Sequence, residues 1–149
     1  MPEKPVRVAL DSSYLIALIS DWHGQHARTL RSYMRWLEEH AEILLPLHAV
    51  AESFSVLTRL PLPYRLSAQL AQQSLSENFA KHAIVVGLQP QRFWRVMEGL
   101  ARLGISGGQV YNALIAASAS EAHASVLMTW NPKHFIPVTP ADLEVRQPE

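Results

Sequence analysis

Short apolar runs without interruption recur along this chain, and segments of helical periodicity separate them. Strands buried on both faces need such unbroken runs, whereas strands with one wet face alternate apolar and polar residues. Four runs have this character: VRVAL (6–10), EILLPL (42–47), AIVVGL (83–88) and SVLMTW (125–130). Strands that alternate with helices in this way predict an α/β fold with a mostly parallel sheet covered on both faces.

The segments between the runs have helical spacing and recognisable ends. Helices are expected over about residues 23–40, 47–60, 67–80, 90–103 and 110–122. Pro90 suits the first turn of its helix, and the PLP of residues 61–63 stops another. Ser12 and Ser13 are expected to supply capping hydroxyls for a helix after the first strand. A short edge strand is expected within residues 136–145.

The size and charge of the chain limit the kinds of protein it can be. Its 149 residues fit a single domain, 1–149, with a real hydrophobic core. Its net charge of zero does not indicate a general affinity for polyanions, so nucleic-acid binding has to come from a local patch. The absence of cysteine excludes disulfides and thiol catalysis. We expect a cytoplasmic protein without membrane association, because neither a signal peptide nor a spanning segment is recognisable.

Two polar residues follow strands of the predicted sheet. Asp11 comes directly after the first apolar run, and Asn131 follows the last. The carboxyl ends of parallel strands meet at one edge, where α/β proteins form their sites, so both residues are expected there. Taken alone, Asp11 fits a helix N-cap equally well, and Glu52 fits a solvated helix face beside His48.

Three stretches together resemble the PIN domain, in particular the VapC-like ribonuclease toxins of bacterial toxin–antitoxin pairs. They are VALDSSYLIALI, LLPLHAVAESFSVLTRLP and GISGGQVYNALIAASASEAHASVLMTWNPKHF, and the resemblance extends over roughly residues 6–140. It implies a three-layer α/β/α fold with a four- or five-stranded sheet. It also implies an endoribonuclease dependent on Mg²⁺ or Mn²⁺, a homodimer, and a cognate antitoxin that blocks the acidic groove.

The resemblance also assigns candidate site residues by position. Asp11 and Glu52 match the first and second metal-binding acids of the family. Asn112 matches the third metal-binding and catalytic position, which is usually aspartate. Asn131 falls in the fourth catalytic region, where the TWN found here is a tolerated variant. Ser13 matches a small hydroxyl residue that supports the first acid.

Contacts to the RNA substrate have to come from local groups. The candidate substrate-binding residues are Ser13, Arg59, Lys133 and His134. Arg59 ends the Glu52 helix, and Lys133 and His134 follow the turn after the last strand. A solvated surface position is an equally good interpretation of each of the three charged residues. If they do touch phosphate, RNA binding is expected to be weak and sensitive to salt.

Asn112 is the main departure from the family pattern. An amide keeps the shape and one acceptor oxygen of aspartate but carries no negative charge. Losing about 3 kcal/mol of attraction would lower metal affinity on the order of a hundredfold, with the fold retained. Three origins would explain the amide: a natural protein of low activity, a natural protein that binds without catalysis, and an engineered substitution.

Other functions fit the same residues. An inert PIN module that binds RNA or a protein partner is favoured by Asn112, whereas Asp11 and Glu52 favour the nuclease. A nuclease directed at DNA would use the same fold. The GISGGQ segment lacks the Lys-Ser/Thr of a P-loop and is interpreted as a plain loop. The tryptophans are expected in the core or at an interface; they are Trp22, Trp36, Trp94 and Trp130.

Overall fold

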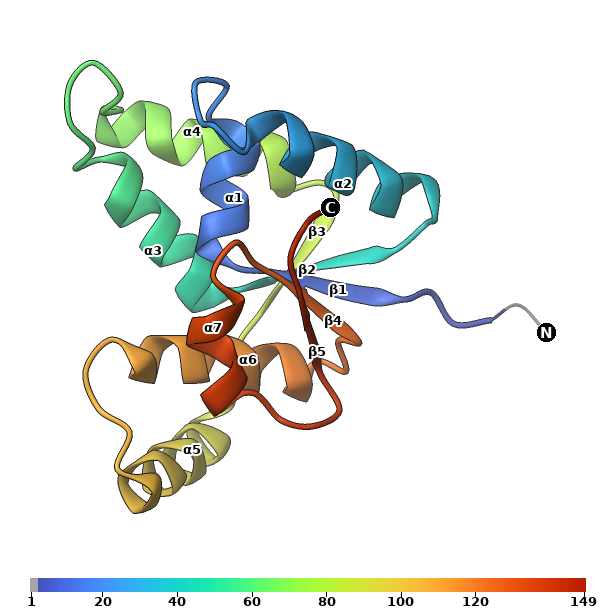
Figure 1. Ribbon diagram of the computed structural model, residues 1–149, viewed down its shortest axis with the longest axis vertical. Helices are drawn as coiled ribbons and strands as arrows, with labels where there is room; N and C mark the ends of the chain where they lie inside the picture. Colours follow the sequence, from blue (N-terminus) through green and yellow to red (C-terminus); the bar gives the residue numbers. More distant parts are fainter. Residues whose placement is uncertain (1–2) are drawn as a thin grey trace.

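A five-stranded parallel sheet organises residues 3–149, the part of the chain that the computed structural model describes (Figure 1). The strands are β1 (Arg7–Leu10), β2 (Glu42–Pro46), β3 (Ala83–Val86), β4 (Val126–Met128) and β5 (Glu144–Arg146). Their order in the sheet is β3-β2-β1-β4-β5, and every neighbouring pair is parallel. The predicted α/β fold with a parallel sheet is confirmed.

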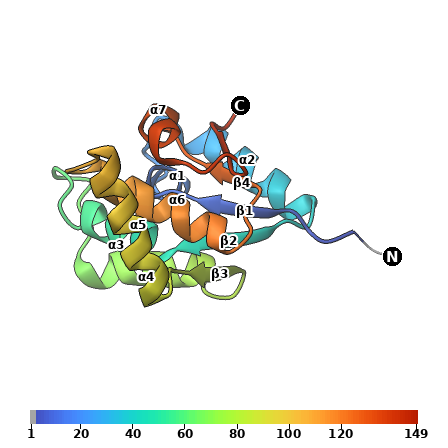
Figure 2. The same ribbon diagram turned by 90° about the horizontal axis from the view of Figure 1, so that it is seen from below.

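Helices cover both faces of this sheet. They are α1 (Ser12–Ile19), α2 (His26–Glu38), α3 (Leu47–Leu57), α4 (Ala68–Phe79), α5 (Pro90–Leu103), α6 (Gln109–Glu121) and the single turn α7 (Pro132–Phe135). Figures 1 and 2 show α1, α2 and α4 on one face and α5 and α6 on the other. The three-layer arrangement is therefore as expected. Within residues 3–149, no helix is long and apolar enough to cross a bilayer.

Local sequence signals account for some element ends and miss others. Helix α5 begins at Pro90 and stops at Gly104, which adopts the left-handed conformation with φ of 71°. The expected edge strand was misplaced, because residues 136–138 form a 3₁₀ turn and the strand is β5, at 144–146. Only pairing with β4 defines this last strand, and three residues are too few to show a period.

The core lies between the central strands and the helices on either face. Val8, Ala9 and Leu10 of β1 are completely buried, which explains why this run has no polar residue. Tyr14 of α1 packs on one side and Ile115 of α6 belongs to the same core cluster. Burying such a large apolar side chain stabilises the fold by about 1.5–3 kcal/mol.

Two of the four tryptophans lie outside the core, whereas Trp36 packs against it. Trp22 is 42% exposed and Trp94 is 69% exposed, so neither belongs to the core. Trp36 and Trp130 are half-buried at the surface. Trp22 instead stacks on Tyr64, with 4.3 Å between the ring centroids. Whether any of them lies at an interface stays a prediction.

The strand order creates a crevice at one edge of the sheet. From β1 the chain builds outward through β2 and β3, and then crosses back to place β4 on the other side of β1. The connections that leave β1 and β4 therefore diverge at their carboxyl ends. Such a switch point is where open α/β sheets bind ligands. Asp11 follows β1 and Thr129 follows β4, so both flank this crevice.

Candidate active site

Asp11 is a buried carboxylate at the switch point, with an exposed fraction of 2%. It is also the N-cap of α1, because its Oδ2 accepts the backbone N–H of Ser13 at 3.4 Å. The expectation that Ser12 and Ser13 cap this helix was wrong, since both are its first helical residues. The N-terminus of α1 favours a negative charge at this position. Capping and ligand binding are therefore compatible for one side chain.

Two hydroxyl groups hold one oxygen of this carboxylate. The Ser13 Oγ donates to Asp11 Oδ2 at 2.9 Å, and the Thr129 Oγ1 donates to the same atom at 2.8 Å. Each hydroxyl in turn accepts a backbone N–H from the turn between β4 and α7. Trp130 N lies 2.9 Å from Ser13 Oγ, and Asn131 N lies 3.0 Å from Thr129 Oγ1. Oδ2 is therefore fully engaged, whereas Oδ1 has a longer contact, 3.3 Å from Ser12 Oγ, and is the oxygen more available to a ligand.

Glu52 reaches the same place from α3. The hydroxyl of Ser12 donates to Glu52 Oε1 and also lies 3.3 Å from Asp11 Oδ1. One hydroxyl oxygen therefore contacts both carboxylates, which come from positions 41 residues apart in the sequence. The structure brings Asp11 and Glu52 together at the β1–β4 edge. Their two negative charges make the crevice attractive to a cation.

Asn112 lies in the first turn of α6 and is half-buried. The preceding Tyr111 packs against α3, with its ring centroid 5.8 Å from that of His48, and shares a shallow hollow with Glu52. Among residues 3–149, no three side chains of Asp, Glu, His or Cys cluster in a way that could hold a metal ion. The described part of the chain therefore offers two carboxylates and no third acid at this site.

The other candidates make no hydrogen bond or ion pair with the two acids among those seen for residues 3–149. Asn131 is exposed and is the N-cap of α7, although its side chain makes no capping hydrogen bond. Lys133 and His134 are exposed on α7, and Arg59 is exposed just beyond the end of α3. The structure assigns none of these side chains a partner that explains its position.

Thr129 and Ser12 contribute to the site although sequence analysis did not single them out. Thr129 is completely buried, and its hydroxyl bonds only within the Asp11 network. A signal was present, since Thr129 is a polar residue near the end of the apolar run SVLMTW. Ser12 had no comparable signal, because a serine beside an N-cap is ordinary.

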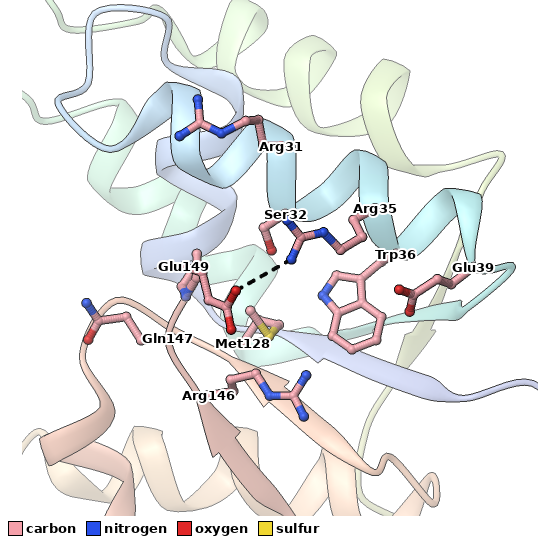
Figure 3. Close-up of a pocket in the computed structure, with 10 residues that line it drawn as sticks. Arg31, Ser32, Arg35, Trp36, Glu39, Met128, Arg146, Gln147 and Glu149 are labelled. Carbon is pink, nitrogen blue, oxygen red and sulfur yellow. Dashed lines mark ion pairs between the residues drawn. The ribbon is translucent and has the colours of Figure 1, made fainter.

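A cluster of charged side chains of both signs lies between α2 and β5. Arg31 and Arg35 of α2 and Arg146 of β5 line one hollow together with Trp36 (Figure 3). Arg146 sits over the Trp36 ring, 5.6 Å from its centroid, and Arg35 pairs with Glu149 at 3.7 Å. Glu39 and Glu149 line the same hollow, and Arg146 also pairs with Glu144 at 2.8 Å, so carboxylates offset the arginine charges there.

A parallel sheet of this order, with acids at the switch point, defines the class of protein. The family model described as PIN domain matches residues 8–135, and the chain belongs to this family. Among its curated relatives is Ribonuclease VapC27 of Mycobacterium tuberculosis, 38% identical over 119 residues that cover 80% of this chain and 81% of the relative. Ribonuclease VapC40 of the same species is 30% identical over 120 residues, or 80% and 84% of the two chains. The protein is thus a VapC-like PIN domain.

Solved structures share this fold at low sequence identity. The Mycobacterium tuberculosis toxin VapC20, described as cleaving the sarcin-ricin loop, has a TM-score of 0.67 at 16% identity, over 89% of this chain and 99% of that one. VapBC2 of Rickettsia felis, solved with a promoter DNA fragment, has a TM-score of 0.67 at 16% identity, over 97% and 100% of the chains. At this identity the likeness concerns the fold alone.

Proposed function

We propose that this protein is an endoribonuclease of the VapC type that cleaves RNA with the help of Mg²⁺ or Mn²⁺. The observation that carries the proposal is the contact of Ser12 with both Asp11 and Glu52 at the switch point. Relatives named ribonuclease, matched over four-fifths of the chain, support the same activity.

The donor atoms fit a hard divalent cation. Mg²⁺ is commonly bound by one or two carboxylates, with water and substrate phosphate completing its shell. Asp11 Oδ1 and the Glu52 carboxylate would provide the protein ligands, and the amide oxygen of Asn112 is the third candidate. When bound, such an ion stabilises negative charge on the scissile phosphate and promotes attack by water.

Neighbouring residues hold the Asp11 carboxylate in one orientation for this chemistry. Ser13 and Thr129 fix the Asp11 carboxylate by holding Oδ2, so Oδ1 keeps one direction. The backbone N–H groups of Trp130 and Asn131 fix those two hydroxyls. An oriented carboxylate does not have to reorganise when the substrate arrives, which is how a surrounding hydrogen-bond network improves a metal site.

Asn112 reduces the charge of the site in this proposal. With Asp11 and Glu52 alone, the carboxylates supply two negative charges, whereas an aspartate at position 112 would add a third. The metal is then held weakly in the free protein and more firmly when an RNA phosphate is present. We therefore propose impaired activity for the chain as it stands.

We also propose two protein partners: an antitoxin and a second copy of this chain. The solved relatives VapBC2 of Rickettsia felis and VapBC of Salmonella typhimurium, both bound to DNA, support an antitoxin. Large apolar side chains on α5 support a homodimer, because Trp94 is 69% and Leu103 is 73% exposed.

A second candidate function is an inert PIN module that binds RNA without cleaving it. The missing carboxylate at position 112 favours it. RNA cleavage assays with Mg²⁺ or Mn²⁺, and with chelator as a blank, separate the two functions. They compare the chain with Asn112→Asp and with the double variant Asn112→Asp/Asp11→Asn. Asparagine at position 11 keeps the helix cap while removing the charge.

Cleavage by Asn112→Asp that the second substitution abolishes is the result expected for the nuclease. Folded proteins that bind RNA but cleave none of it, with aspartate at position 112 and either metal present, would support the inert module instead. A circular dichroism spectrum of each variant ensures that loss of activity is not loss of the fold.

A further inference from the structure

A hollow of about 540 Å³ opens beside Ser13, the residue whose hydroxyl holds Asp11. Its walls come from α1 and the loop that follows it, the end of α3, the turn between β4 and α7, and Gln147 after β5. A volume of this size is within the range of about 300–1,000 Å³ that small-molecule sites occupy. We call it the Trp22 hollow, after the aromatic residue that lines its outer wall.

We infer that the Trp22 hollow binds one unpaired nucleobase of the RNA substrate, next to the phosphate that is cleaved. This inference rests on the proposed function and adds a site for substrate recognition to it. Three observations support it: an exposed aromatic stack, free amide groups in an uncharged lining, and direct continuity with the Asp11 network.

The aromatic stack is the first observation. Trp22 is 42% exposed, yet it is held in place because its ring stacks on Tyr64, with centroids 4.3 Å apart and planes at 28°. Trp130, which also lines the hollow, is fixed by Arg28 at 5.0 Å from its centroid and by a 2.8 Å bond from its Nε1 to Thr29 Oγ1. Fixed rings offer a base a stacking surface without first having to be ordered.

The chemistry of the lining is the second observation. The lining includes neither Lys nor Arg, so it suits a neutral base better than a phosphate. The amide residues Gln25, Asn131 and Gln147 line the hollow. The side chains of Gln25 and Asn131 do not cap their own helices, so their amides can form hydrogen bonds with a base edge. His23 Nδ1 accepts the backbone N–H of Gln25 at 3.0 Å, so the neutral ring carries its proton on Nε2.

Continuity with the acids is the third observation. Ser13 lines the hollow and donates to Asp11, and Trp130 lines it and donates its backbone N–H to Ser13. A base held there leaves its own sugar and phosphate at the edge where Asp11 and Glu52 meet. Only a base that has left a helical stack enters such a hollow, so the occupant is single-stranded RNA or an unpaired loop.

The test uses a short single-stranded RNA that the Asn112→Asp protein cleaves at a mapped position. In a set of otherwise identical RNAs, each nucleotide near the cut is replaced in turn by an abasic nucleotide. At one position the loss of the base is expected to lower kcat/KM by about tenfold or more. Trp22→Ala is expected to lower kcat/KM on the intact RNA by a similar factor and to remove the penalty of the abasic position.

Two matched variants complete the design. Trp22→Phe keeps an aromatic ring and is expected to restore most of the difference between intact and abasic RNA. Leu70→Ala removes an apolar side chain of α4 that is 53% exposed and lies outside the Trp22 hollow, and is expected to leave that difference unchanged.

The outcomes separate this inference from the proposed function. If RNA is cleaved but no abasic position near the cut matters, the base site is wrong and the nuclease stands. If none of the proteins cleaves RNA, fluorescence anisotropy with a short single-stranded RNA, made abasic at each position in turn, still decides. A preference for intact over abasic RNA that Trp22→Ala abolishes supports the base site on an inert module. Equal binding of both RNAs overturns it.

Discussion

The hydroxyl of Thr129 donates a 2.8 Å hydrogen bond to Oδ2 of Asp11, although 118 positions of the chain separate the two residues. Both side chains are buried, at 0% and 2% exposure. The bond joins the carboxyl ends of β1 and β4 across the switch point of the sheet. It therefore connects the stability of the fold to the orientation of the proposed metal ligand.

Replacing Thr129 by valine should damage both properties, because valine keeps the shape and removes the donor. A buried carboxylate and the N–H of Asn131 would each lose a partner. We expect the free energy of unfolding to fall by about 1–3 kcal/mol. Urea denaturation measures this change, and Mn²⁺ calorimetry is expected to show weaker metal binding.

The control is Thr58→Val, which removes hydroxyl hydrogen bonds at the exposed end of α3. In this variant the free energy of unfolding should change by no more than about 0.5 kcal/mol. Equal losses in both variants would argue against a special role for Thr129.

Restoring the acid at position 112 should strengthen metal binding. Asn112→Asp adds a negative charge in the first turn of α6, where an anion is favourable, and about 3 kcal/mol of added attraction corresponds to roughly a hundredfold in affinity. Calorimetric titration with Mn²⁺ measures the change. Asn78→Asp adds the same charge to the exposed face of α4 and should leave the affinity unaltered. Identical affinities for the chain and Asn112→Asp would refute the charge argument.

His23 should titrate at a lower pH than an ordinary histidine. Burial in the Trp22 hollow is the main cause that lowers its pKa from 6.5, and the nearby His26 adds electrostatic repulsion. The unfolded chain then binds this proton more readily than the folded one. Its contribution to stability is therefore present above about pH 6.5 and declines as the pH falls below that value. An NMR titration of the ring proton measures the pKa, and His26→Gln is expected to raise it. A pKa of His23 at or above 6.5 would contradict this assignment.

Two glycines of α5 should respond to alanine with opposite signs. Gly99 lies inside the helix, and a Cβ there meets no atom within 4 Å, so Gly99→Ala is expected to stabilise the protein by about 0.5–1 kcal/mol. Gly104 ends the helix at a φ of 71°, where alanine is strained, and Gly104→Ala is expected to cost about 1 kcal/mol. Chemical denaturation of the two variants in parallel measures both effects. Stabilisation by Gly104→Ala would show that glycine is not needed at this cap, and destabilisation by Gly99→Ala would contradict the expected gain in helix propensity.

Much of the fold was predictable because its signals are local. The buried run VRVAL predicted β1, since a strand covered on both faces excludes polar residues. Pro90 marks the start of α5 and Gly104 marks its end, because of the backbone preferences of these two residues. The edge strand β5 was misplaced because only its pairing with β4 defines it. The helical turn α7 was missed because four residues are too short to display a period.

The residues of the site likewise fall into those that the sequence indicated and those that only the structure revealed. Asp11 and Glu52 came from a family pattern along the chain, and no local rule places them together. Thr129 and Ser12 emerged only from the structure, since a hydroxyl acquires its role from what lies across the sheet. The Trp22 hollow is likewise a product of packing, because the residues that line it come from four separate parts of the chain.

By itself, the order of residues determined the alternation of helices and strands, the layered α/β class and the missing acid at position 112. These properties depend on side-chain size, polarity and backbone preference, which act over a few neighbouring residues. The tertiary structure alone decided that Ser12 contacts two carboxylates, that Thr129 completes their network and that an uncharged hollow opens beside them. Hydrogen bonds act only over a few ångströms, so partners 40 or 118 positions apart meet only after the sheet has formed.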